Sequence, residues 1–230
     1  MLITICRLVL HDYLFYASRE MGRLYETEKY LHNYGLTYAL GLASSPFANL
    51  AQVPRYQDDL EEVNRRGIYV TPAYPVSYSF AFHTFKMAQE KYYGLTPQIS
   101  SNQVVYGRAK ELAPESTFTF CVLSEDQVVL PCWIRLGKWM AKAHLTILAC
   151  SQARLKQGRY HVAGALNPLD VATMPDNCNI IAMAPASLIT NAYYDGDYYE
   201  ISYSVQEQQH TACLPVAMRY RPRHLSTSSK

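Results

Sequence analysis

A strand with two apolar faces lies near the start of the sequence and restricts the fold more than any other segment. In an extended chain, side chains point alternately to opposite faces. Between residues 2 and 10, even positions such as Cys6 and Leu8 form one face, and odd positions such as Ile5 form the other. A strand that is apolar on both faces has to be covered on both, so we expect it in the centre of a sheet. Arg7 is the charged exception and marks a face that is partly open.

Helical and alternating patterns follow in an order that mixes both kinds of element. Apolar residues recur at helical spacing from Thr27 to Leu42, and a second, shorter helix is predicted from Asp58 to Arg66. Strand alternation is clear at 78–87 and 117–123, and we expect these two segments to pair across the long excursion 88–115. Other strands are predicted at 68–70, 127–134, 143–150, 158–164, 179–184, 197–204 and 213–220.

The order of these elements indicates an α+β fold of the RRM or ferredoxin-like type with β-rich C-terminal additions. A chain of 230 residues can hold this fold as a single elaborated domain. No GxGxxG turn follows a strand, which argues against a dinucleotide-binding fold. We expect a core, an insertion, a β-rich C-terminal part and a loose tail at residues 1–87 with 116–165, 88–115, 166–220 and 221–230, respectively.

The composition excludes several classes of protein. Tyrosine accounts for 20 residues and hydrophobic residues for 49%, which is incompatible with a disordered chain. The six cysteines form no CxxC or other zinc spacing, so we expect free thiols in a cytoplasmic protein, with no metal and no other cofactor. Arg7 interrupts the first apolar run, and no uncharged apolar window reaches the length of about 18 residues that a membrane span needs. We therefore expect neither a signal peptide nor a membrane contact.

The charge of the chain is unevenly spread. The net charge is only +2, but no Asp or Glu occurs from Gln127 to Leu169. A whole-chain balance can hide such a local field, which would attract an anionic partner. The basic residues and histidines of this acid-free stretch are Arg135, Lys138, Lys142, Arg154, Lys156, Arg159, His144 and His161.

The most informative part of that stretch is the segment from Ile134 to His144. Gly137 allows the backbone to approach a ligand closely. Three cations of the segment can neutralise phosphates, and its tryptophan can stack on a base or a sugar, a combination that suits single-stranded nucleic acid. These residues are Arg135, Lys138, Lys142 and Trp139. The alternative is a surface turn whose cations lie along the protein and whose tryptophan packs in the core.

A second candidate for phosphate binding is the loop before the first predicted helix. Hydroxyl and guanidinium groups near a helix start can hold a phosphate. The candidate residues of this loop and of the predicted first turns are Tyr16, Ser18, Arg19, Arg23, Tyr25 and Lys29. The alternative is a closed salt-bridge network among Arg19, Glu20, Arg23, Glu26 and Glu28.

The histidines leave a catalytic alternative open. His144 could act as the base of a metal-independent ribonuclease, with Lys142 stabilising the charged phosphorane. In a binding role, His144 instead joins the RNA-contacting residues. The acidic run at 58–62 lies on a predicted helix that mostly faces solvent, so we do not expect a carboxylate metal site there.

Two segments resemble a CRISPR-associated family. The sequences LHDYLFYASREMG at 10–22 and LYETEKYLHNY at 24–34 resemble the start of the Cas-five-type (Csc-one) subunit of type I-D Cascade effectors. This similarity covers about residues 1–45. The sequence RLGKW at 135–139 is similar to the glycine-containing RNA-binding loop of that family.

The resemblance implies an RRM-like RAMP fold with a long β-hairpin thumb, which falls at 88–115 in this chain. It implies binding of the crRNA 5′ handle at one end of the effector complex. The implied neighbours are the first Cas-seven-type backbone subunit, the large subunit and the PAM-proximal target DNA. Nucleic-acid contacts from the thumb region are expected at Lys86, Lys91, Tyr92 and Arg108.

The resemblance leaves catalysis as a separate question. Some relatives cut their own crRNA precursor with a Tyr, Lys and His set, and no convincing set of this kind maps onto the chain. A non-catalytic RNA-binding subunit is therefore the leading hypothesis. The alternatives are the metal-independent ribonuclease and a purely protein-bridging subunit whose tyrosines anchor interfaces.

Overall fold

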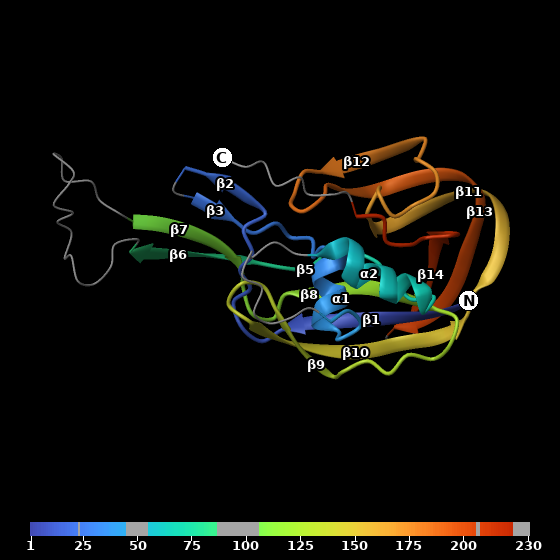
Figure 1. The fold of residues 1–230 in the computed structure, drawn as a ribbon, viewed down its shortest axis with the longest axis horizontal. Coiled ribbons are helices and arrows are strands. Elements are labelled where there is room, and N and C mark those ends of the chain that lie inside the picture. Colours follow the sequence, from blue (N-terminus) through green and yellow to red (C-terminus); the bar gives the residue numbers. More distant parts are fainter. Residues whose placement is uncertain (23, 45–54, 87–105, 206–207, 223–230) are drawn as a thin grey trace.

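The described part of the chain folds into three β-sheets and two helices. The computed structural model describes residues 1–22, 24–44, 55–86, 106–205 and 208–222 (Figure 1). The main sheet has the strand order β4-β8-β1-β10-β9, and β5 also pairs with β8. Its strands are β1 (Leu2–Leu10), β4 (Tyr69–Val70), β5 (Tyr74–Ser77), β8 (Thr117–Ser124), β9 (Trp133–Leu136) and β10 (Ala141–Gln152).

The first strand lies in the middle of the main sheet, as its two apolar faces predict. β1 pairs antiparallel with β8 on one side and with β10 on the other. Ile5 is 1% exposed and Leu8 is 0% exposed, although the two side chains point to opposite faces. Burial of each such side chain stabilises the fold by roughly 1.5–3 kcal/mol. Arg7 is only partly buried, which confirms that one face is less completely covered.

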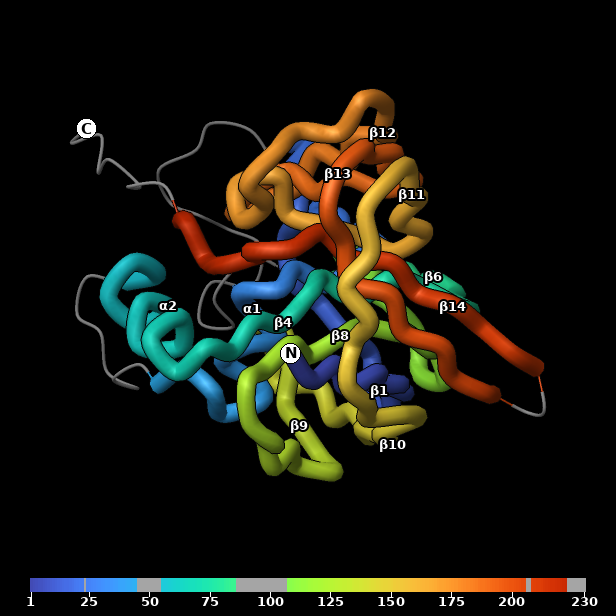
Figure 2. Tube along the Cα trace, turned by 90° about the vertical axis from the view of Figure 1, so that its right-hand side faces the viewer, coloured from blue at the N-terminus to red at the C-terminus, as the bar shows by residue number. Residues whose placement is uncertain are grey.

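The first helix packs on one face of the main sheet, and the second lies on the same side and buries Leu60 and Val63 in the same core (Figure 2). They are α1 (Asn33–Ala39) and α2 (Tyr56–Arg65). α2 confirms the predicted second helix, with acidic residues in its first turn and Arg65 in its last, where the helix dipole favours them. α1 is much shorter than the predicted helix from Thr27 to Leu42.

The predicted start of the first helix is wrong because the backbone before it is used for extended pairing. The Thr27 N–H donates to the Lys110 carbonyl, and Leu31 forms a β-bridge with Ala73. These bonds hold the segment away from helical geometry. The helix begins only after His32, whose side chain accepts a hydrogen bond from the Tyr34 N–H and caps the first turn.

The remaining strands form two smaller sheets. The second sheet has the order β11-β13-β12, with β14 also paired to β13, and its strands are β11 (Arg154–Leu166), β12 (Asn177–Ile181), β13 (Leu188–Val205) and β14 (Gln208–Pro215). The third sheet has the order β2-β3-β7-β6, and its strands are β2 (Arg19–Met21), β3 (Leu24–Glu26), β6 (Phe80–Lys86) and β7 (Tyr106–Leu112). β10 leads into β11 through Ala153, so the main and second sheets share a nearly continuous strand path.

The predicted pairing between 78–87 and 117–123 is wrong. β6 pairs with β7, from Phe80 opposite Leu112 to Lys86 opposite Tyr106, inside the expected excursion. β5 occupies the β8 edge instead. The chain leaves that edge at Ser79, whose carbonyl accepts the Ala113 N–H, and β6 and β7 then run outwards together (Figure 1). The insertion is therefore a hairpin that starts at β6, earlier than residue 88.

Several strand boundaries in the second half also differ from the prediction. In the segment predicted as a strand at 127–134, only its last two residues are in β9. β13 begins at Leu188 rather than at 197, and β14 begins at Gln208 rather than at 213. The first half of β13 does not show the regular alternation of apolar and polar residues by which strands are predicted. Asn191 has a positive φ of 52°, and Asp195-Gly196 interrupts the apolar pattern.

The cysteines are free thiols, as their spacing predicts. Cys6 and Cys121 are buried, Cys132 and Cys150 are exposed, and the other two are intermediate. Burial raises the pKa of the Cys121 thiol to about 12, so this thiol stays protonated at neutral pH. Within the described residues, no group of His, Cys, Asp and Glu has the arrangement of a metal site. In the same part of the chain, no helix is long and apolar enough to span a membrane.

A buried carboxylate joins the helices to the C-terminal part. Asp170 is 0% exposed and accepts hydrogen bonds from the Asn33 amide at 2.7 Å, the Tyr69 hydroxyl at 3.2 Å and the Tyr34 hydroxyl at 3.3 Å. The Arg221 N–H donates to it at 2.9 Å. One side chain thus connects α1, β4 and the segment after β14, three parts that are far apart in the sequence.

The stability of this network should depend on pH. Burial raises the pKa of Asp170 from 3.8 to about 6, against the opposing effect of its hydrogen bonds. Because the folded state keeps this proton to higher pH than the unfolded state, the contribution to the free energy of unfolding is largest below about pH 4 and is lost as the pH rises through about 6. The variant Asp170→Asn cannot titrate. Relative to this variant, the free energy of unfolding of the wild type should fall by up to about 3 kcal/mol between about pH 4 and pH 7.

Urea unfolding of both proteins across this pH range measures the effect. The quantity of interest is the difference between their free energies of unfolding at each pH, because any constant cost of the substitution cancels. Two stability curves that stay parallel across the range would contradict the account of Asp170.

Candidate nucleic-acid interface

The predicted RNA-binding loop forms a β-hairpin at the edge of the main sheet. β9 and β10 pair so that Arg135 lies opposite Lys142 and Trp133 lies opposite His144. The alternate residues of β9 are buried on the α1 side, for example Ile134 at 3% exposure. The four paired side chains therefore share the sheet face that points away from the helices.

A close backbone contact holds the turn of this hairpin. Gly137 has a φ of +71°, and a Cβ there would lie 2.4 Å from the Phe15 carbonyl oxygen and 2.6 Å from Leu14 Cδ1. The neighbouring Lys138 N–H donates to the same Phe15 oxygen at 2.8 Å. A glycine is needed here both for its left-handed backbone and for the space. The predicted close approach at Gly137 is thus made to this chain's own first loop.

Trp139 combines the two roles that the sequence left open. Its ring stacks on Phe15, with centroids 4.4 Å apart and planes 26° apart. The side chain is nevertheless 53% exposed. One part of the ring packs on the protein while the rest stays available to a stacking partner.

Trp133 forms the centre of an aromatic group that the sequence reasoning missed. The Lys142 Nζ lies 4.2 Å from the centre of its ring, and the rings of His144 and His11 lie 4.6 and 4.9 Å away. Trp133 remains 45% exposed. The register of the hairpin places Trp133 beside His144. A comparison of alternate residues in segments 133–136 and 141–144 would have indicated that these two side chains share a face.

The electrostatics of the turn are dominated by cations. Arg135 donates to the Met140 carbonyl at 3.0 Å and has a long contact of 3.9 Å with Asp12. The same Asp12 oxygen accepts the Lys142 backbone N–H at 2.9 Å. Among the described residues, neither Lys138 nor Lys142 forms an ion pair. Three cations therefore face one carboxylate at this turn, which leaves a net positive field.

We call this region the hairpin surface. It consists of His11, Trp133, Arg135, Gly137, Lys138, Trp139, Lys142 and His144. A hollow of about 690 Å³ adjoins it, between the edge strand β9 and the Gly35 and Tyr38 side of α1.

The acid-free stretch of the sequence does not form one basic patch. Its second half is in β11, whose partner strand β13 supplies the missing acids. Lys156 pairs with Glu200 at 2.7 Å, and Arg159 lies 3.7 Å from Asp195. Two cations of the second half are therefore paired with acids, whereas Lys138 and Lys142 of the hairpin surface form no ion pair among the described residues.

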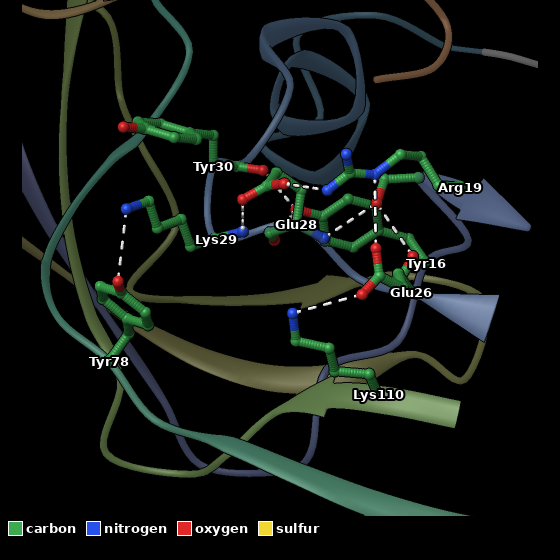
Figure 3. A network of polar contacts seen from close by, with 9 residues as sticks. Tyr16, Arg19, Glu26, Glu28, Lys29, Tyr30, Tyr78 and Lys110 are labelled. Carbon is green, nitrogen blue, oxygen red and sulfur yellow. Dashed lines mark hydrogen bonds and ion pairs between the residues drawn. The ribbon is translucent and has the colours of Figure 1, made fainter. Parts of the chain in front are cut away.

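The predicted phosphate-binding loop that precedes α1 is held mainly by its own hydrogen bonds (Figure 3). The Tyr16 hydroxyl donates towards the carbonyl oxygens of Glu28 and Tyr30, and burial raises the pKa of Tyr16. The Ser18 hydroxyl donates to the Glu26 carbonyl at 2.9 Å and accepts the Glu28 N–H at 2.9 Å. These groups stabilise the turn, and RNA contacts from Tyr16 and Ser18 stay a prediction.

Among the described residues, the structure contains part of the salt-bridge network that was the alternative to phosphate binding, without Glu20 and with Lys110 added. Arg19 pairs with Glu26 at 3.4 Å and with Glu28 at 2.9 Å, and Lys110 approaches Glu26 at 3.6 Å. Lys29 contacts the Tyr78 hydroxyl at 3.3 Å (Figure 3). Arg19 is nonetheless half-exposed, so an RNA phosphate would have to compete with two carboxylates for it.

Three of the remaining predicted contacts belong to strands of the third sheet. Tyr25 is half-buried in β3, beside Phe85 of β6. Arg108 is exposed in β7 and lies opposite Thr84. The backbone of Lys86 ends β6. Arg23, Lys91 and Tyr92 lie outside the described residues.

A histidine and a buried glutamate form a pair that the sequence reasoning did not identify. His83 Nδ1 lies 2.9 Å from Glu111 Oε2, and Glu111 is 1% exposed. The ring of Tyr13 meets His83 edge-on at 4.8 Å. The pairing of β6 with β7 was needed to bring these residues together, and that register was not predicted.

Comparisons with known proteins place the chain in a family. Residues 1–223 match the family described as Type I-D CRISPR-associated protein Cas5/Csc1. No curated protein matches the chain. Among solved structures, a chain in the cryo-EM structure of the Type III-B Cmr-beta bound to cognate target RNA and AMPPnP is similar, with a TM-score of 0.46 and 8% identity over 84% of this chain and 86% of that one. The protein belongs to the type I-D CRISPR-associated Cas5/Csc1 family.

Proposed function

We propose that the protein is a non-catalytic subunit of a type I-D CRISPR effector complex and holds the single-stranded 5′ handle of the crRNA on its hairpin surface. The family supports the setting in a CRISPR effector complex. One observation carries the ligand class: Arg135, Lys138 and Lys142 share a hairpin with two half-exposed tryptophans, and among the described residues the carboxylate that pairs with these cations is that of Asp12. Cations beside exposed aromatic rings are the arrangement that binds single-stranded nucleic acid.

The proposed binding mode follows from the positions of these side chains. Lys138 and Arg135 neutralise consecutive phosphates at the turn, and Lys142 does so on the strand. Trp139 offers its exposed part to a base, with Phe15 supporting the other side of the ring. Stacking of this kind tolerates any base and is worth about 1–3 kcal/mol per base. The handle would thus be held by charge and stacking, and its sequence would be read elsewhere.

The strand order supports the finer proposal of an RRM-like RAMP fold. In β4-β8-β1-β10, the strand that follows the helices lies at one edge, and β1 is antiparallel to both of its neighbours. This is the order of a ferredoxin-like sheet. The second crossover, from β8 to β10, carries β9 and the hairpin surface where a ferredoxin-like fold has a helix. The candidate site therefore occupies a connection that differs from that of a ferredoxin-like fold.

Three exposed apolar side chains lie on strands outside the hairpin surface. Phe82 on β6 is 63% exposed, Ile180 on β12 is 70% exposed and Val76 on β5 is 64% exposed. The expectation of protein partners comes from the family, and these side chains are positions at which it can be tested. We propose that these surfaces face the Cas-seven-type backbone subunit and the large subunit near the PAM-proximal target DNA. The β6–β7 hairpin serves as the proposed thumb, with Arg108 on its surface.

Removal of two cations from the hairpin surface should weaken RNA binding. In the full chain, Arg135→Ala with Lys138→Ala should lower the affinity for a ten-nucleotide single-stranded RNA at least tenfold, because each contact to a charged group is worth about 1.5–3 kcal/mol. The slope of log affinity against log salt should fall by about 1.4, or 0.7 per phosphate. The same double variant should reduce the crRNA content of the purified effector complex.

The matched control removes two cations from the other half of the acid-free stretch. Arg154→Ala with Arg159→Ala changes the net charge equally but leaves the hairpin surface intact. An equal loss of affinity in both double variants, or none in the first, would contradict the proposed site. Binding reactions that contain EDTA and repeat RNA also test the non-catalytic role, because the RNA should be recovered at full length. Site-specific cleavage that disappears in His144→Ala would favour the ribonuclease instead.

A single methyl group at Gly137 should disturb both the fold and the site. In Gly137→Ala, the left-handed backbone costs about 1–2 kcal/mol. The new Cβ must also move the turn away from the Phe15 carbonyl, which lies 2.4 Å from its ideal position. Chemical unfolding should show the combined cost, and RNA affinity should fall because Lys138 and Trp139 lose their anchor.

Gly41→Ala separates the two effects. Gly41 has a φ of +72°, almost the same as Gly137, but a Cβ there meets nothing within 4 Å. This variant should show the backbone cost alone and bind RNA normally. If the two alanine variants lose equal stability, the close contact with Phe15 does not hold the turn.

A further inference from the structure

A cavity of about 590 Å³ lies between the main sheet and the second sheet, away from the helices. Its floor is the open face of β1 and β8, including Arg7 and Thr119. Its other wall comes from the second sheet, including His161, Tyr203 and His210. A volume of this size is within the range of about 300–1,000 Å³ that holds small organic ligands.

The side chain of Arg7, which lines this cavity, has an unsatisfied hydrogen-bond donor. It lies in the middle of β1, opposite Thr119 on one side and Thr146 on the other. Its Nε is shielded from solvent and has no hydrogen-bond partner among the described residues. No described residue that lines the cavity is acidic. A buried guanidinium N–H without an acceptor is unfavourable, so an anionic group that enters the cavity would gain a strong, charge-assisted bond.

The cavity is reached along the same sheet face as the hairpin surface. On β10, alternate residues Lys142, His144 and Thr146 point to this face, and Thr146 is the residue that lies opposite Arg7. Two residues along a strand span about 7 Å. These side chains therefore form a continuous row along one sheet face, from the hairpin surface to the Arg7 guanidinium in the cavity.

We propose that the cavity receives one nucleotide of the single-stranded RNA held on the hairpin surface, with its phosphate on Arg7. The base lies among the aromatic rings of the second sheet, where His210 stacks on Tyr203 at 5.4 Å. Threonine hydroxyls of β8 face it from the floor of the cavity. This inference rests on the proposed function and adds to it a second, enclosed subsite that fixes the path of the strand.

Two variants of the full chain test the subsite by different means. Arg7→Gln removes the charge, and should weaken binding of a ten-nucleotide polyadenosine RNA by about tenfold or more and lower the salt slope by about 0.7. Gly164→Leu narrows the cavity, because Gly164 lines it and a Cβ there meets nothing within 4 Å. It should weaken binding while leaving the salt slope unchanged, since no charge is lost. Arg159→Gln, at an 87% exposed side chain on β11, should bind like the wild type.

The outcomes separate this inference from the proposed function. If Arg7→Gln and Gly164→Leu bind the RNA like the wild type while Arg135→Ala with Lys138→Ala does not, the hairpin surface stands and the subsite is wrong. If adenosine monophosphate alone binds in an Arg7-dependent way but RNA affinity does not change in either variant, the cavity serves a free nucleotide and the inference is also overturned. If the hairpin double variant retains full affinity, the proposed function fails by itself.

Discussion

The contact between Gly137 and Phe15 is the constraint on which the candidate site depends. It fixes the turn of the β9–β10 hairpin against the loop after β1, at a distance that only a glycine allows. The same loop supplies Asp12, which positions the Lys142 backbone, and Phe15, which supports the Trp139 ring. The loop after the central strand and the hairpin at the sheet edge thus form one unit. The backbone of the turn and the Trp139 ring are held in place before any ligand arrives, which lowers the entropy cost of binding.

The centre of the fold could be predicted from the sequence because local pattern and tertiary environment agree there. Both faces of β1 are mainly apolar and largely buried, and Arg7 marks the less completely covered face in the sequence and in the structure. The pattern failed where distant pairing overrides it. Residues 27–31 have helical spacing, but their backbone bonds to Lys110 and Ala73 hold them extended. β6 pairs with β7 rather than β8, and no local feature of either strand encodes that choice.

The candidate site shows the same division between local and distant information. The cations and tryptophan at 135–142 are adjacent in sequence, so their chemistry could be predicted directly. Trp133 and His11 join them only through strand register and a loop contact. The acid-free stretch was misleading in its second half, because Glu200 and Asp195 face its cations from β13. In a β-rich chain, a run of basic residues therefore predicts a basic surface only when the residues on the partner strand are also known.

We propose that the hairpin surface contacts guide RNA in the assembled complex. Photo-crosslinking tests it directly, with 4-thiouridine placed at single positions of the crRNA 5′ handle and the crosslinked peptides identified by mass spectrometry. We expect crosslinks to the peptide that contains residues 133–142 of this chain. Handle nucleotides that crosslink only to other subunits, or only to the outer side of the second sheet, would contradict it.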